Sequence, residues 1–308
     1  MIVVVAPGQG SQTPGFLAPW LELEGARERL EAYSDASGVD LVAAGTDWDA
    51  DAIRDTQVAQ PLIVAASILA WTALTDGGAK PAGVAGHSVG EIAALVAAGV
   101  LGDLDGLRLV GVRGRAMAEA AELEPTGMSA ILGGETDEVV ATLATLDLTP
   151  ANYNGGGQIV AAGALPALAA LAEAPPAGAR VIPLQVAGAF HTRYMAPAVE
   201  ALRAQAGALP TADPVLTLWT NRDGSVVTSG AQAIELLVGQ VANPVRWDLC
   251  QTAFSDAGVT GIIELAPAGT LVGLARRSLK GVPTIAIKTP DDLDAARAMI
   301  DAANDGKA

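Results

Sequence analysis

The chain of 308 residues is long enough for one large α/β domain or two smaller ones. Hydrophobic residues make up 51% of it and charged residues 17%, so it can bury a sizeable core, which argues against global disorder. The net charge of −16 argues against general binding to nucleic acids or anionic membranes, because such binding requires a basic surface.

Cysteine and histidine are scarce in this chain. The single cysteine, Cys250, excludes an intrachain disulfide, and one cysteine with two histidines argues against a conventional zinc site. The N-terminal residues lack the basic flank and long apolar stretch of a signal peptide. The longest apolar run, residues 61–74, is short for a membrane span and indicates a buried helix. We therefore expect a soluble, cytoplasmic protein.

The first 125 residues alternate predicted strands with predicted helices. A β-branched run at residues 2–6 indicates a buried strand, and it ends in a loop that begins at Pro7. Pro61 suits the first turn of a helix, so the apolar run that it opens is predicted to be helical. A short strand is expected at residues 84–86, and further helices at 89–98 and 104–121.

The middle of the chain has a different rhythm. Its predicted elements follow the order β-α-β-β-α-β, which is the ferredoxin-like arrangement. We therefore expect residues 126–187 to form a small inserted subdomain. Its strands are predicted at residues 128–132, 149–153, 158–162 and 180–184, and its helices at 137–146 and 165–172.

After this insertion the α/β alternation returns. Strands are predicted at residues 215–219, 261–265 and 284–287, with helices between them and at 291–303. Residues 1–125 and 188–308 are therefore expected to form one α/β core.

The sequence Gly-His-Ser-Val-Gly at residues 86–90 stands between a predicted strand and a predicted helix. This is the context of a nucleophile elbow, in which the two glycines let the strand and helix pass closely around a strained turn. The N terminus of the helix would place free N–H groups beside Ser88, so the backbone N–H of Val89 is a candidate oxyanion donor. The alternative is a glycine-rich turn in which Ser88 only caps the helix.

Only two histidines, His87 and His191, could serve as the general base that a serine nucleophile usually needs. His87 is adjacent to Ser88 on a sharp turn, where successive side chains diverge. His191 is therefore the candidate base. Taken alone, an isolated histidine in a loop would be expected to form a structural hydrogen bond. The presence of a candidate nucleophile, Ser88, favours a role as the base instead.

The segment Gly-Gln-Gly-Ser-Gln at residues 8–12 follows the first predicted strand. A dinucleotide-binding fingerprint would require a third glycine at position 13, but that residue is Thr13 and Pro14 follows it. A loop that turns the Gln9 backbone N–H toward an oxyanion fits this segment better.

Arg113 and Met117 stand four residues apart on a predicted helix and so share one face. The planar guanidinium of Arg113 could grip a carboxylate with two parallel hydrogen bonds, which an ammonium group cannot do. Taken alone, the residue would be read as a surface arginine.

These segments together resemble the malonyl-CoA:acyl carrier protein transacylase family. The resemblance runs over nearly the whole chain, and its order and spacing are specific. One departure is Ala268, where relatives more often have glycine. The matching segments are GQGSQ at 8–12, QP at 60–61, GHSVGE at 86–91, RGRAM at 113–117, Asn154, AFH at 189–191, NPVRW at 243–247 and PAGTL at 267–271.

The resemblance implies several roles. Ser88 would be the acylated nucleophile, His191 its base, and the backbone N–H groups of Gln9 and Val89 the oxyanion hole. Arg113 would bind the malonyl carboxylate. A backbone carbonyl would orient the histidine, by position that of Arg246. The acyl pocket would be lined by Gln60, Met117, Asn154 and Phe190. The fold implied is an α/β-hydrolase-like core with an inserted ferredoxin-like subdomain.

The reaction implied is transfer of malonyl from malonyl-CoA to the phosphopantetheine thiol of holo acyl carrier protein, by a ping-pong mechanism through a malonyl-serine intermediate. It requires no metal and no resident cofactor. It would serve fatty-acid or polyketide synthesis, and we expect a monomer. The alternatives are a serine esterase or thioesterase, which would use the same elbow, and a catalytically silent module that docks the carrier.

Overall fold

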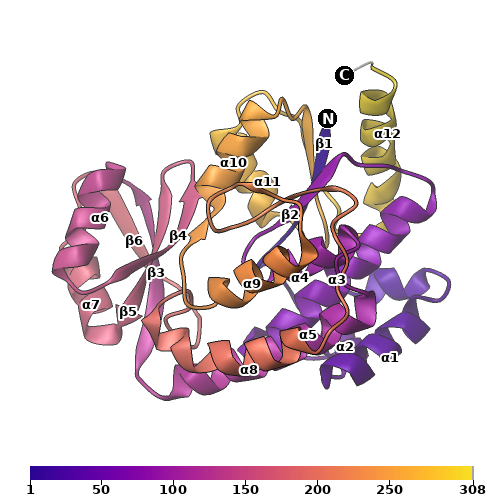
Figure 1. Ribbon diagram of the computed structural model, residues 1–308. Helices are drawn as coiled ribbons and strands as arrows, with labels where there is room; N and C mark the ends of the chain where they lie inside the picture. Colours follow the sequence, from indigo (N-terminus) through magenta and orange to yellow (C-terminus); the bar gives the residue numbers. More distant parts are fainter. Residues whose placement is uncertain (307–308) are drawn as a thin grey trace.

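The computed structural model describes residues 1–306 as a mixed α/β fold with two sheets (Figure 1). The larger sheet has six strands in the order β11-β10-β1-β2-β7-β8, and only the pairing of β7 with β8 is antiparallel. Its strands are β1 (Ile2–Ala6), β2 (Gly83–Gly86), β7 (Thr217–Trp219), β8 (Val226–Val227), β10 (Gly261–Glu264) and β11 (Thr284–Ala286).

The central strand β1 is buried along its whole length, as its uninterrupted β-branched sequence predicts for a parallel sheet covered on both faces. Alternate residues of β1 belong to two different hydrophobic clusters: Val4 to one and Val3 and Val5 to the other. The helices of this part are α1 (Ala26–Ser37), α2 (Leu41–Thr46), α3 (Thr56–Asp76), α4 (Gly90–Ala97), α5 (Asp103–Glu122), α8 (Ala196–Gly207), α9 (Gly230–Gln240), α10 (Trp247–Asp256), α11 (Thr270–Ser278) and α12 (Leu293–Asn304).

The long apolar helix α3 starts at Thr56, five residues earlier than the sequence predicted. The Asp55 carboxylate accepts the backbone N–H of Gln57 and so caps the helix, which leaves Pro61 inside it rather than in its first turn. The helix is long and apolar enough to cross a membrane, but 72% of its most apolar stretch is buried in the fold. It therefore serves as a core helix.

The second sheet lies to one side of the first (Figure 1). Its strand order is β6-β3-β5-β4-β9, and the first four strands are antiparallel to one another. It has a hydrophobic cluster of its own, which includes Ile131, Leu143 and Leu171. The elements between residues 126 and 183 are β3 (Thr126–Gly133), α6 (Thr136–Thr145), β4 (Thr149–Gly155), β5 (Gln158–Ala164), α7 (Leu165–Glu173) and β6 (Ala179–Pro183).

The fifth strand of this sheet comes from much later in the chain. β9 (Val245–Arg246) runs parallel to β4, with Asn152 opposite Val245 and Tyr153 opposite Arg246. The Arg246 guanidinium also lies over the Tyr153 ring, 4.5 Å from its centroid. The two parts of the molecule are thus joined by a backbone ladder as well as by the connections at each end of the insertion.

Candidate active site

Ser88 lies in a tight turn between β2 and α4, with a positive φ of 53°. The two glycines on either side make this turn possible. A Cβ on Gly86 would lie 2.1 Å from the backbone of Gly90, and one on Gly90 would lie 2.3 Å from the carbonyl oxygen of Ala6. Neither position has room for a larger residue, so the glycine spacing gives the strained turn expected of a nucleophile elbow.

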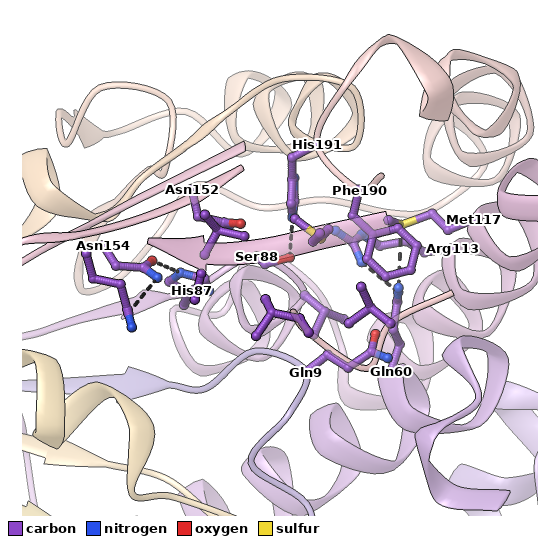
Figure 2. A pocket seen from close by; sticks show the side chains of 17 residues that line it. Gln9, Gln60, His87, Ser88, Arg113, Met117, Asn152, Asn154, Phe190 and His191 are labelled. Carbon is purple, nitrogen blue, oxygen red and sulfur yellow. Dashed lines mark hydrogen bonds between the residues drawn. The ribbon is translucent and has the colours of Figure 1, made fainter. Parts of the chain in front are cut away.

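His191 faces Ser88 from the loop that follows β6. Its Nε2 lies 2.7 Å from the Ser88 Oγ (Figure 2). On the other side of the ring, Nδ1 lies 2.8 Å from the carbonyl oxygen of Gln240. Because a carbonyl can only accept, Nδ1 carries the proton and Nε2 presents its lone pair to the serine hydroxyl. This is the tautomer that a general base requires.

The carbonyl that orients His191 belongs to Gln240, whereas the sequence predicted that of Arg246, so this prediction is wrong. Gln240 is the last residue of α9, where helix carbonyls lack a partner within the helix and remain free to accept. Arg246 instead lies in β9, and its backbone N–H donates to the Asn221 carbonyl.

The environment keeps His191 neutral. Its side chain is buried, which disfavours the charged imidazolium, and the positive charge of Arg113 adds to this effect. Together they lower the pKa of His191 to about 3. The imidazole is therefore in its basic form throughout the physiological pH range.

Two backbone N–H groups beside Ser88 are available to an oxyanion. Gln9 and Val89 both line the cavity in front of the serine, and within residues 1–306 neither backbone N–H donates a hydrogen bond. The Gln9 side chain is anchored by a 3.2 Å hydrogen bond to the Arg54 carbonyl, which holds its loop. The N–H of Ser88 itself is already bonded to Asn221 Oδ1 at 2.7 Å.

Arg113 forms one wall of the same cavity and is only 1% exposed. Its two terminal nitrogens donate to neutral amide oxygens, those of Gln60 at 2.6 Å and Gln240 at 2.9 Å. In the described part of the chain its Nε has no partner, and no carboxylate forms an ion pair with it. Burial lowers its pKa to about 10, with Glu91 opposing, so it stays charged at neutral pH.

The cavity has a volume of about 200 Å³, and residues from both parts of the molecule line it (Figure 2). All the site residues predicted from the sequence line it, except Arg246. Met117 also accepts a weak hydrogen bond from Gln60, and Asn154 bonds His87 at 2.9 Å. The remaining lining residues, which were not predicted, are His87, Met128, Ala130, Asn152, Gln158, Val160, Leu184 and Val186.

Three polar residues behind the elbow were missed at the sequence level. Gln240 donates to the Ser88 carbonyl and to the Glu91 carboxylate, and Asn221 bonds both the N–H of Ser88 and, at 2.6 Å, the carbonyl of Gly86. Glu91 stands out in the sequence as the only charged residue in the otherwise apolar helix α4. Gln240 and Asn221 gave no such signal, because their partners are far away along the chain.

A family model described as the acyl transferase domain matches residues 3–298. The chain belongs to the acyl transferase family. Among its relatives, the malonyl CoA-acyl carrier protein transacylase of Mycobacterium tuberculosis is 54% identical, covering 96% of this chain and 98% of the relative. The enzyme of that name from Escherichia coli K12 is 33% identical, covering 95% and 97% of the two chains.

Solved structures of this family superpose closely on the chain. The MCAT structure from Mycobacterium tuberculosis has a TM-score of 0.94 at 54% identity, covering 96% of this chain and 99% of that one. A second structure shows a type II PKS acyl-carrier protein in complex with its malonyl-transacylase. It has a TM-score of 0.92 at 31% identity, covering 97% and 99% of the two chains. An acyl transferase fold therefore accounts for nearly the whole chain.

Proposed function

We propose that this protein is a malonyl-CoA:acyl carrier protein transacylase. The observation that carries the proposal is the buried Arg113 guanidinium, held by two neutral amides in the same cavity as the Ser88–His191 pair. A cation buried without a carboxylate partner suits an acyl group that ends in a carboxylate, as malonyl does and acetyl does not. The names of the relatives support the same donor and the same acceptor.

The first half-reaction forms an acyl-enzyme. Ser88 Oγ attacks the thioester carbonyl of malonyl-CoA as His191 Nε2 takes its proton. The negative charge that develops on the carbonyl oxygen would be stabilised by the backbone N–H groups of Gln9 and Val89, and losing one such donor typically costs about 10²–10³ in rate. The C–S bond then breaks, and His191 returns the proton to the departing coenzyme A sulfur.

The second half-reaction repeats these steps with a new thiol. The phosphopantetheine thiol of the carrier gives its proton to His191 and attacks the malonyl-serine ester. When the tetrahedral intermediate collapses, the C–O bond breaks and the proton passes to the Ser88 oxygen. Malonyl leaves on the carrier and the free enzyme is restored, so the kinetics are ping-pong.

We also assign residues 126–187 as a ferredoxin-like subdomain and residues 1–125 and 188–308 as an α/β-hydrolase-like core, of which residues 307–308 lie outside the described part. The strand order β6-β3-β5-β4 with two helices supports the first assignment. The parallel sheet with its strand-turn-helix elbow supports the second. A cytoplasmic location, a monomeric state and independence from metals or resident cofactors stay predictions from the sequence.

Intact-protein mass spectrometry after brief mixing with malonyl-CoA tests the proposal. We expect a malonyl adduct that peptide mapping locates at Ser88, that is absent from Ser88→Ala, and that holo acyl carrier protein discharges faster than water. Ser67→Ala is a suitable control, since it removes another buried hydroxyl, bonded to the Ala266 carbonyl. Discharge to water at the same rate as to the carrier would indicate an esterase or thioesterase instead.

A further inference from the structure

Gln240 contacts four groups of the site. Its backbone carbonyl accepts the Nδ1–H of His191 at 2.8 Å. Its side-chain Oε1 accepts from Arg113 at 2.9 Å, and its Nε2 donates to the Ser88 carbonyl at 3.0 Å and to the Glu91 carboxylate. One buried residue therefore joins the base, the turn that carries the nucleophile and the candidate carboxylate-binding cation.

The orientation of the Gln240 amide is fixed by the charges around it. A guanidinium can only donate hydrogen bonds, so Oε1 must face Arg113, and Nε2 then faces Glu91. Burial raises the pKa of Glu91 to about 7, while the hydrogen bonds from Asn221 and Gln240 favour its ionised, accepting form. Glu91 is itself held, because its other oxygen accepts the backbone N–H of Asn221 at 2.6 Å. The carboxylate thus anchors the amide, and the amide in turn holds the guanidinium.

This arrangement places a buried cation and a buried carboxyl group on opposite sides of a neutral amide. Arg113 is 1% exposed and Glu91 is 6% exposed, yet the two share no direct hydrogen bond. A carboxylate bonded directly to Arg113 would occupy its fork and neutralise the charge that an incoming acyl carboxylate requires. An amide supplies an acceptor and a fixed geometry while the positive charge remains available.

We propose that Gln240 is a positioning residue. Its side chain, anchored by Glu91, holds the Arg113 guanidinium at a fixed distance and orientation from the Ser88–His191 pair. This inference rests on the proposed function. The carboxylate of the acyl group binds at one end of this assembly, and the thioester carbonyl reacts at the other. A fixed spacing between Arg113 and Ser88 therefore favours malonyl, which uses both ends, over acetyl, which uses only the reactive end.

Gln240→Met tests the proposal, because it keeps the chain length and the backbone carbonyl on His191 but removes the amide. We expect kcat/KM for Ser88 acylation to fall about tenfold or more further for malonyl-CoA than for acetyl-CoA, as suits the loss of a hydrogen bond to a charged group. The same substitution in an Arg113→Ala background should leave the malonyl-to-acetyl ratio where Arg113→Ala alone puts it.

Two further variants make this test decisive. Gln251→Met is the matched control, since Gln251 is a buried glutamine whose amide bonds the backbone carbonyls of Asn154 and Trp247 and none of the groups above. It should lower stability without changing the ratio. Glu91→Gln removes the anchoring carboxyl group and should shift the ratio in the same direction as Gln240→Met. If Gln240→Met does not fold, Glu91→Gln decides the question with the same measurement.

Equal losses for malonyl-CoA and acetyl-CoA would overturn the proposal, since the amide would then serve only the serine and histidine or the general stability of the site. A change in ratio that persists without Arg113 would overturn it as well. The wild-type protein separates this failure from failure of the proposed function. If it forms no malonyl adduct at Ser88, the function itself is wrong, whereas normal loading with an unmoved ratio rejects only the role of Gln240.

Discussion

Arg113→Ala should remove most of the preference for a malonyl over an acetyl donor. In the wild type, the carboxylate would meet a guanidinium whose Nε–H has no partner in the described part of the chain and whose charge no carboxylate neutralises by direct contact. A hydrogen bond between charged groups is worth about 1.5–3 kcal/mol, so a bidentate contact contributes roughly 3–6 kcal/mol. At about 1.4 kcal/mol per factor of ten, the malonyl-to-acetyl ratio should fall by roughly two to four orders of magnitude.

The assay is kcat/KM for acylation of Ser88, measured for both donors by rapid quenching and intact-protein mass spectrometry. Arg113→Lys should give an intermediate ratio, because an ammonium keeps the charge but not the planar fork. Arg115→Ala is the matched control. It lies on the same helix but is exposed, with its side chain bonded to the Ser37 carbonyl. A malonyl-to-acetyl ratio that is the same in Arg113→Ala and in the wild type would refute this reading of the cavity.

Three other predictions concern the base, the acyl pocket and the carrier. Because burial and the positive charge of Arg113 lower the pKa of His191 to about 3, the imidazole stays unprotonated as pH falls. Since burial also raises the pKa of Glu91 to about 7, the pH profile is measured in Glu91→Gln, where kcat/KM for acylation should show no loss with a midpoint near 6.5; such a loss would contradict the low pKa of His191. Phe190→Ala should improve methylmalonyl-CoA relative to malonyl-CoA by an amount worth about 1–3 kcal/mol, the usual value of one methyl, and an unchanged ratio would make Phe190 a core residue only. Arg276 in α11 and Lys280, two residues past its end, are exposed cations. If the carrier is net acidic, reversing both charges to glutamate should raise its KM and leave malonyl-serine formation unchanged; a rise in KM for malonyl-CoA instead would assign these charges to the coenzyme A phosphates.

The elements of the fold were largely predictable because local sequence patterns specify them. The six elements between residues 126 and 183 appear in the predicted order, each within about two residues of its predicted bounds. The start of α3 was missed because Asp55, rather than the more conspicuous Pro61, marks it. The predicted lining residues could be identified because each belongs to a recognisable motif or is a rare functional group in the sequence.

The groups that support the site could not be predicted in the same way. The carbonyl that orients His191 belongs to the last residue of α9, six positions before Arg246, and nothing local distinguishes one backbone carbonyl from another. Asn221 bonds the elbow from 133 residues away in the chain. Such contacts depend on how distant segments pack together, which hydrophobic periodicity does not encode.

The short strand β9 has a consequence for how the two thiol substrates reach Ser88. It pairs with β4 in the second sheet and follows α9, whose last carbonyl orients His191. Swinging the two sheets apart would break this ladder and disturb the base at the same time. The cleft should therefore keep its width through the catalytic cycle. We expect coenzyme A to leave, and the carrier's phosphopantetheine arm to arrive, through the same rigid entrance. One arm must therefore leave before the other can enter, with no motion of the protein needed to separate them.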